Sequence, residues 1–264
     1  MSDFNEAYVH FSSLSIRSLP TFEDYLFGGV TLEERVKDKI IVITGATDGI
    51  GEALTYRLAM KGGRILYVGR NMEKLDAVGA KLLLLGVGER CRGYQCNLSD
   101  RKECEKLVQT VLSDFTYIDI LVNNAGRSIR RTVDHVSLDR MHDYTRTIDL
   151  NYYGPVILTI GFLPSMRRRK SGIIINNSTF GTVTLSPGFS AYSGSKSALN
   201  AFACCVDREV RKVYTGGSIL LSLPPLMIVM RIYYRTIYPF LLYLCLLYKP
   251  RWFRSPSKSI SLVW

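Results

Sequence analysis

A glycine-rich turn between an apolar run and a helical pattern constrains the fold more than any other feature of this chain. The run Ile40-Ile-Val-Ile leads directly into Thr44-Gly-Ala-Thr-Asp-Gly-Ile-Gly51. A strand, a glycine turn and a helix in this order form a cradle for a pyrophosphate, because the N-terminus of the helix points at the anion. Gly45 then permits the tight turn, Gly49 lets the backbone approach the phosphates, and Gly51 lets the helix pack close to the strand. The alternative is a purely structural glycine turn.

The rest of the chain repeats this strand and helix alternation. Predicted strands lie near residues 40, 65, 93, 119, 173 and 219, with helical stretches between them. This order predicts an α/β fold built of parallel βα units rather than a sandwich. The 264 residues contain no internal repeat and suit a single domain. We expect an N-terminal extension at 1–38, the nucleotide-binding domain at 39–223, and an atypical apolar and basic segment at 224–264.

The end of the second predicted strand indicates which dinucleotide would bind. The strand Arg64-Ile-Leu-Tyr-Val-Gly69 is followed by Arg70, where an acidic residue would accept hydrogen bonds from a ribose 2′-hydroxyl. An arginine suits a 2′-phosphate, so we favour NADP(H) over NAD(H). The charge of Asp48, inside the glycine turn, is an argument against this because it would repel a nearby phosphate. After the third strand, Cys96-Asn-Leu-Ser-Asp100 is placed to reach the adenine ring.

Polar residues follow the later strands and accompany one pair on a helix. Asn123-Asn-Ala-Gly126 closes the fourth strand, Asn151 lies in a helical stretch at 145–160, and Ser178 ends the fifth strand. Tyr192 and Lys196 stand four residues apart, which places them on one face of a helix. An ammonium group beside a phenol favours the phenolate, and such a tyrosine can transfer a proton near neutral pH. Without these neighbouring motifs, the Tyr192–Lys196 pair would be interpreted as a solvent-exposed helix face. Asn151 would be interpreted as a buried amide whose hydrogen bonds are all made within the core.

Taken together, these motifs resemble the short-chain dehydrogenase/reductase family over roughly residues 38–223. The resemblance implies a doubly wound parallel sheet of the Rossmann type, with a nicotinamide cofactor across its carboxyl edge. The resemblance implies that Tyr192 is the general acid/base and that Lys196 assists it while holding the nicotinamide ribose. It also implies that Ser178 orients the substrate oxygen and that Asn151 anchors a water in a proton relay toward Lys196. The cofactor contacts expected from the same resemblance are Gly45, Thr47, Asp48, Gly49, Ile50, Gly51, Arg70, Asn97, Leu98, Asn124, Ala125, Gly126, Tyr192 and Lys196.

Two further phrases resemble the reductase module of fatty acyl-CoA reductases. They are Asn124-Ala-Gly-Arg-Ser-Ile-Arg-Arg131 with His142 to Asn151, and Phe189-Ser-Ala-Tyr192. The resemblance implies reduction of an apolar carbonyl, in a long-chain acyl-CoA or a fatty aldehyde, by hydride transfer. Steroid or retinoid carbonyls are the alternative substrates, and a noncatalytic NADP-binding protein is the alternative class. The family resemblance also implies a homo-oligomer.

Charge and cysteine content limit the location and the partners. The net charge is +11, but the last forty residues hold six basic residues and no acid, and Arg167-Arg-Arg-Lys170 reads as a solvated helix end. We therefore expect no nucleic-acid partner. The six cysteines lack paired or zinc-like spacing, which predicts reduced thiols and no metal site. The first residues lack a signal-peptide pattern, so the expected location is cytoplasmic.

The segment after the sixth predicted strand departs from the family pattern. Pro224-Pro225 stands where the family usually has Pro-Gly before a loop that contacts the nicotinamide, although Pro-Leu replaces it in the acyl-CoA reductase group. Residues 226–248 are apolar and aromatic but too interrupted to predict a membrane-spanning helix. They either cover the substrate or lie on the cytosolic face of a membrane as a peripheral contact. A truncated terminus is the third reading, and 259–264 would then be a candidate for a last strand.

Overall fold

The computed structural model describes residues 32–213 and 218–223, which form a six-stranded parallel sheet. The strand order is β3-β2-β1-β4-β5-β6, so the direction of winding reverses between β1 and β4. This confirms the doubly wound Rossmann fold and all six predicted strand positions. The strands are β1 (Ile40–Thr44), β2 (Arg64–Gly69), β3 (Arg92–Gln95), β4 (Ile120–Asn123), β5 (Gly172–Asn177) and β6 (Ser218–Leu223).

The central strands are mostly apolar because both faces of the sheet are covered. All five residues of β1 are buried. Ile40 and Val42 join the core on one face, whereas Ile41 and Ile43 join the core on the other. Alternate side chains point to opposite faces of a strand, so a strand between two helical layers is buried on both sides and mostly apolar; in β1 the polar Thr44 stands at the carboxyl end. This burial explains why the short β-branched runs were sufficient to locate the strands.

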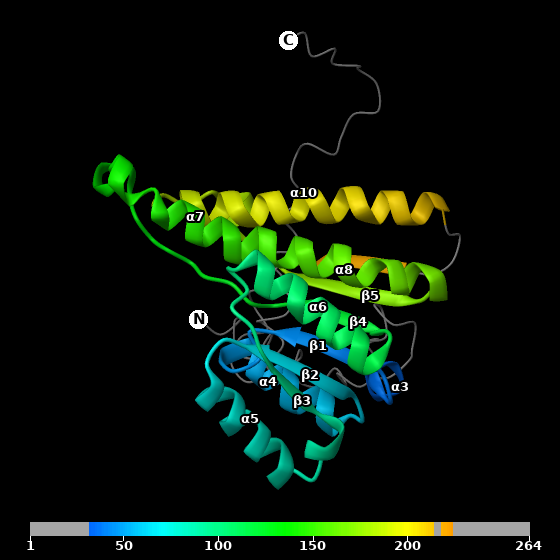
Figure 1. Ribbon diagram of the computed structural model, residues 1–264. Coiled ribbons are helices and arrows are strands. Elements are labelled where there is room, and N and C mark those ends of the chain that lie inside the picture. Colours follow the sequence, from blue (N-terminus) through cyan, green and yellow to red (C-terminus); the bar gives the residue numbers. More distant parts are fainter. Residues whose placement is uncertain (1–31, 214–217, 224–264) are drawn as a thin grey trace, which may run out of the picture.

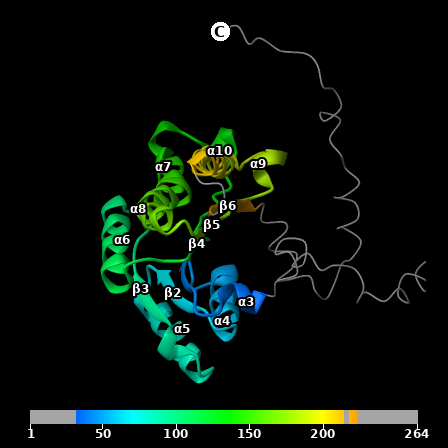
Figure 2. The same ribbon diagram turned by 90° about the vertical axis from the view of Figure 1, so that its right-hand side faces the viewer.

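Helices cover both faces of the sheet (Figures 1 and 2). On one face lie α4 (Gly49–Met60) and α5 (Met72–Leu84), with the short α3 (Leu32–Val36) beside them. On the other face lie α6 (Arg101–Phe115) and α8 (Gly154–Arg169). The long α10 (Ser190–Val213) runs along α7 (His142–Ile148) and against β6. The short elements are η1 (Gly88–Arg90), η2 (Val133–His135), η3 (Leu138–Arg140) and α9 (Gly181–Thr184).

One turn of π-helix joins α7 to α8. It spans Asp149–Tyr153 and contains Asn151, so the helical stretch predicted around that residue is present but locally widened. The helix presses closely on the loop after β3, since a Cβ added to Gly154 would lie 2.6 Å from the Leu98 carbonyl oxygen. Single π-turns within α-helices frequently mark functional sites.

Arg169 lies at the amino-terminal ends of the strands and contacts the residues just before β4. The interpretation of residues 167–170 as a solvated helix end is therefore wrong for Arg169. Its guanidinium donates to Asp119 Oδ1 at 3.0 Å and to the Ile118 carbonyl at 2.7 Å, and it stacks on the Tyr117 ring. Asp119 Oδ2 also accepts the Ile40 N–H at 3.0 Å. This basic residue therefore ties the end of α8 to the start of β4 and β1.

Several expectations fall outside the described residues. They concern residues 1–31, the segment 224–264 with its Pro224-Pro225 pair, and Cys245. Within the described part, Val36 of the leader packs into the core, and the five cysteines there are free. The same residues contain no cluster of ligands suited to a metal ion. None of the helices described combines the length and apolar character needed to cross a bilayer.

Candidate active site

The glycine turn after β1 fits a phosphate-bearing cofactor. Gly45 has φ +62°, and a Cβ there would stand 2.9 Å from the Ala125 Cα, so the turn packs directly on the chain after β4. A Cβ on Gly51 would collide with the Gly45 carbonyl oxygen. Gly49 differs, because it has φ +54° and no atom lies within 4 Å of the position its Cβ would take. Two glycines thus serve packing, and the third leaves open backbone at the N-terminus of α4, where an anion is stabilised.

Side-chain hydrogen bonds join the carboxyl ends of β1, β4 and β5. Thr44 Oγ1 accepts the backbone N–H groups of Asn124 and Ala125 at 2.9 and 3.1 Å. The Asn124 amide donates to the Thr44 carbonyl at 3.0 Å and accepts from Asn177 Nδ2 at 3.0 Å. These bonds fix the turn that carries Gly126 beside the first glycine turn. The predicted contacts Asn124, Ala125 and Gly126 therefore lie together at the crevice where the sheet reverses.

Asn151 is fully buried and its amide is committed to the same region. Its Oδ1 accepts the Arg127 N–H at 2.8 Å, and its Nδ2 donates to the Arg127 carbonyl at 2.9 Å and to Ser195 Oγ at 3.0 Å. Ser195 Oγ in turn donates to the Tyr192 carbonyl at 2.7 Å. Asn151 thus couples the turn after β4 to the helix that carries Tyr192. The water relay remains a prediction, and both amide protons already have acceptors in the protein.

Lys196 is buried close to Asn151 and to the turn after β4. Its side chain is 3% exposed, and its ammonium donates to the Asn177 carbonyl at 2.8 Å. Burial lowers its pKa from 10.5 to about 8, because desolvation penalises the charged form. A Cβ on Gly126 would stand 3.3 Å from both Lys196 Nζ and Asn151 Oδ1, so the three residues meet. Tyr192, one helical turn earlier on α10, is partly buried.

Ser178 supplies a buried, unpaired hydroxyl at the site. It follows β5 directly, next to the residue whose carbonyl binds Lys196, and it is 4% exposed. Its hydroxyl has no hydrogen-bond partner among the residues that the structure describes. A buried hydroxyl without a partner costs free energy unless a ligand satisfies it. This hydroxyl is therefore suited to a polar atom of a bound substrate.

The remaining predicted cofactor residues follow β1, β2 and β3 at the carboxyl ends of these strands. Thr47 packs on Gly69, whose Cβ would stand 2.7 Å from Thr47 Cγ2, and Ile50 lies in the first turn of α4. Arg70 is exposed at the end of β2. After β3, Asn97 is exposed, whereas Leu98 is buried in the core. Arg70 and Asn97 are thus accessible, and the Leu98 side chain is not.

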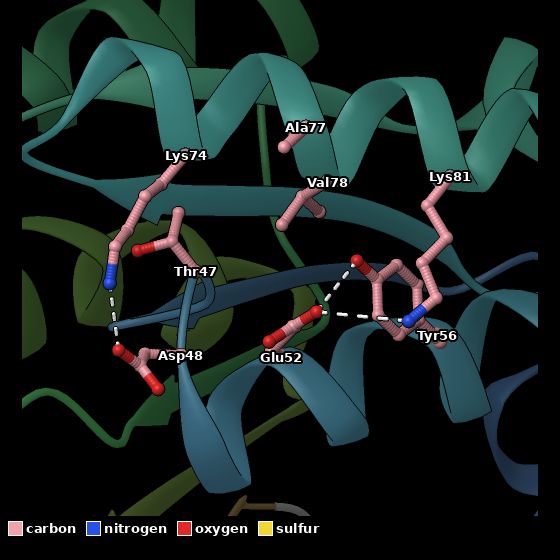
Figure 3. Close-up of a pocket in the computed structure, with 8 residues that line it drawn as sticks. All are labelled: Thr47, Asp48, Glu52, Tyr56, Lys74, Ala77, Val78 and Lys81. Carbon is pink, nitrogen blue, oxygen red and sulfur yellow. Dashed lines mark hydrogen bonds and ion pairs between the residues drawn. The ribbon is translucent and has the colours of Figure 1, made fainter.

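Asp48 has a cationic partner that the sequence did not suggest. Its carboxylate accepts from Lys74 Nζ at 2.8 Å, and this contact holds the pKa of Asp48 below its ordinary value. The pair stands at one end of a pocket of about 340 Å³ between α4 and α5 (Figure 3). At the other end Tyr56 donates to Glu52 at 3.0 Å beneath Lys81. Because Lys74 neutralises Asp48, the repulsion between Asp48 and a bound phosphate is weaker than the sequence alone suggested.

Sequence reasoning did not single out Ser195, Asn177 or Lys74. Ser195 was detectable as a hydroxyl three residues after Tyr192, on the same helical face. Asn177 was detectable because Asn176-Asn177 ends β5 as Asn123-Asn124 ends β4, and the two pairs meet in register. Lys74 lies 26 residues from Asp48 and carried no signal in the sequence.

Comparisons with known proteins agree with this geometry. A family profile described as short chain dehydrogenase matches residues 39–214. A fatty acyl-CoA reductase of Acinetobacter baylyi is 44% identical over 179 residues, which cover 68% of this chain and 60% of the relative. A metagenomic short-chain oxidoreductase in complex with NADP has a TM-score of 0.62 at 29% identity, covering 67% of this chain and 78% of its own. An NAD⁺-bound xylitol dehydrogenase has a TM-score of 0.64 at 26% identity, covering 72% and 70%.

This chain spans only 60% of the length of the Acinetobacter relative. Within that span, the profile match, the sequence identity and the strand order all indicate the same relationship. The chain therefore belongs to the short-chain dehydrogenase/reductase family.

Proposed function

We propose that this protein is an NADPH-dependent reductase of an apolar carbonyl, in a long-chain fatty acyl-CoA or a fatty aldehyde. The observation that carries the proposal is the buried, unpartnered hydroxyl of Ser178 beside the residue that binds Lys196. A helix that carries an acid/base residue and a buried, unsatisfied hydroxyl at the end of β5 together suit a substrate oxygen that becomes negative during reaction. The substrate class is supported by the 44% identity to a relative named as a fatty acyl-CoA reductase.

In this proposal Ser178 and Tyr192 act on the carbonyl oxygen, and Lys196 and Asn151 keep Tyr192 in place. The cofactor supplies a hydride to the carbonyl carbon. Ser178 donates a hydrogen bond to the oxygen, and Tyr192 transfers its phenol proton to it, so an aldehyde becomes a primary alcohol. With an acyl-CoA, one hydride and one proton are added and the carbon–sulfur bond breaks, releasing an aldehyde and the thiol of coenzyme A. Lys196 and Asn151 position Tyr192.

The cofactor preference rests on the basic groups at the end of β2. Arg70 is exposed there, and Lys74 follows one helical turn later in α5. Thr47 of the glycine turn packs against Gly69, immediately before Arg70. Lys74 is paired with Asp48, so the net positive charge at this corner comes from Arg70. Arg70 and the Thr47 hydroxyl suit the 2′-phosphate of NADPH better than an unmodified ribose.

Replacing Arg70 with glutamine is expected to weaken NADPH binding by about 10- to 10²-fold, because a hydrogen bond to a charged group contributes about 1.5–3 kcal/mol. NADH binding should be nearly unchanged. Titration of cofactor fluorescence measures both dissociation constants without substrate. Arg57→Gln, an exposed arginine on α4, is the control. An equal loss for NADPH and NADH would show that Arg70 does not read the 2′-phosphate.

A substrate panel tests the function itself. Purified protein with NADPH is offered a fatty aldehyde, a long-chain acyl-CoA, a steroid ketone and a retinoid aldehyde, and the alcohol products are identified by mass spectrometry. We expect reduction of the aliphatic substrates, and loss of that activity in Ser178→Ala. Turnover of the steroid or retinoid alone would reassign the substrate, and tight NADPH binding with no turnover would identify a noncatalytic protein.

A further inference from the structure

The rim of the candidate active site exposes large apolar side chains on two separate segments. On η2, η3 and the start of α7 they are Val133, Leu138 and Met141, and Leu138 is 90% exposed. On α9 and the residues flanking it they are Phe180, Val183 and Leu185, and Val183 is 72% exposed. Neither segment packs these side chains against the sheet. They lie at the edge of the sheet where Ser178 and Tyr192 are found.

Hydrogen bonds hold the two segments around the N-terminus of α10. The Arg131 N–H donates to the Gly188 carbonyl at 2.7 Å, and the Tyr144 hydroxyl pairs with Ser190 Oγ at 2.9 Å. A Cβ on Gly188 would stand 3.3 Å from Arg130 Cγ. Gly188 and Ser190 lie between α9 and Tyr192 in the chain. The apolar side chains are thus carried by a preassembled rim rather than by independent loops.

The same rim is basic. Residues 127–146 contain five arginines and three aspartates, a net charge of +2. Arg131 is paired with Asp143 at 2.7 Å. The other arginines are exposed and form no salt bridge with any residue of the described ranges: Arg127, Arg130, Arg140 and Arg146. Apolar side chains flanked by unpaired arginines are typical of surfaces that lie in the interface of an anionic membrane.

From this combination we propose that the rim formed by residues 127–146 and 180–190 docks on an anionic phospholipid surface. The apolar side chains would enter the boundary between headgroups and acyl chains, and the arginines would contact the phosphates. The proposed contact is peripheral, because it is made by exposed side chains of the rim. Among the described residues, no helix is long and apolar enough to cross a membrane. Docking in this orientation would turn the side of the molecule that carries Ser178 and the N-terminus of α10 toward the lipid phase.

Charge distinguishes this partner from two others. The last forty residues of the chain carry six basic residues and no acid, so their charge repels the arginine-bearing rim. A second copy would bring the same basic rim against itself in a twofold interface, with like charges opposed. An anionic membrane complements both the rim and the basic terminal segment.

The test is cosedimentation of the full chain with vesicles of phosphatidylcholine, with and without phosphatidylserine. We expect binding to the anionic vesicles, and a loss of affinity on the order of tenfold in Leu138→Ser/Val183→Ser, because each lost side chain removes apolar burial. Arg130→Gln/Arg140→Gln should bind the two vesicle types equally weakly. Leu84→Ser is the matched control, because Leu84 is 89% exposed at the end of α5.

Each outcome decides the proposal. It is overturned if wild-type protein binds neither vesicle, if it binds both equally, if the rim variants bind as wild type, or if Leu84→Ser loses as much affinity. A fall in oligomer mass by light scattering in the rim variants would instead identify a second copy as the occupant. Circular dichroism checks that every variant is folded. The measurement uses no substrate, so it is independent of the proposed reductase activity.

Discussion

Replacing Tyr192 with phenylalanine is expected to lower kcat for a fatty aldehyde by about 10²- to 10⁴-fold, the usual contribution of a positioned general acid. The ring is retained, so the packing of α10 against Asn151 through Ser195 should remain intact. NADPH should bind nearly as in the wild type. Stopped-flow oxidation of NADPH and a separate fluorescence titration measure the two quantities.

The control for Tyr192→Phe removes a phenol oxygen elsewhere. Tyr94 lies on β3, outside the site, and Tyr94→Phe deletes a hydroxyl that donates to Asp114 Oδ2 at 2.8 Å. It should leave kcat unchanged. Turnover by Tyr192→Phe at the wild-type rate would mean that the proton comes from another group.

Replacing Lys196 with methionine is expected to abolish most turnover and to change how stability depends on pH. Burial lowers the pKa of Lys196 from 10.5 to about 8. The unfolded chain therefore holds this proton more tightly than the folded chain does. The charged form costs stability below pH 8, and that cost disappears as the pH rises from about 8 to 10.5.

The measurable consequence is a difference between two unfolding curves. Between pH 7 and 11, the free energy of unfolding of the wild type should rise by about 3 kcal/mol relative to Lys196→Met, since one pKa unit corresponds to about 1.36 kcal/mol. Urea denaturation at a series of pH values provides both curves, and other titrating groups cancel in the difference. Lys102→Met, at an exposed lysine on α6, is the control. A pH-independent difference would show that Lys196 is not desolvated.

The parts of the fold that the sequence predicted are those specified locally. β1 and β5 were located because Ile40-Ile-Val-Ile and Gly172-Ile-Ile-Ile are β-branched and bounded by turn residues. The glycine turn was predicted because only glycine accepts the positive φ of Gly45 and Gly49 without strain. In each case a few adjacent residues contain the physical cause.

The parts that the sequence did not predict depend on distant residues. The π-turn at Asn151 has no glycine or proline within it, and the adjoining Gly154 presses on Leu98, more than fifty positions earlier in the chain. The Asp48–Lys74 pair and the Arg169–Asp119 pair likewise join residues that only the folded sheet brings together. Sequence spacing carries no information about such contacts, so the ion-pair partners of Asp48 and Arg169 could not be predicted.

The proposed hydride transfer can be tested directly by isotope labelling. The protein is incubated with a fatty aldehyde and NADPH deuterated at the transferring position of the nicotinamide ring, and the alcohol is analysed by mass spectrometry. The proposed mechanism predicts one deuterium on the former carbonyl carbon in the wild type, and almost no labelled alcohol with Tyr192→Phe. An alcohol without deuterium, or no alcohol at all from protein that binds NADPH, would contradict it.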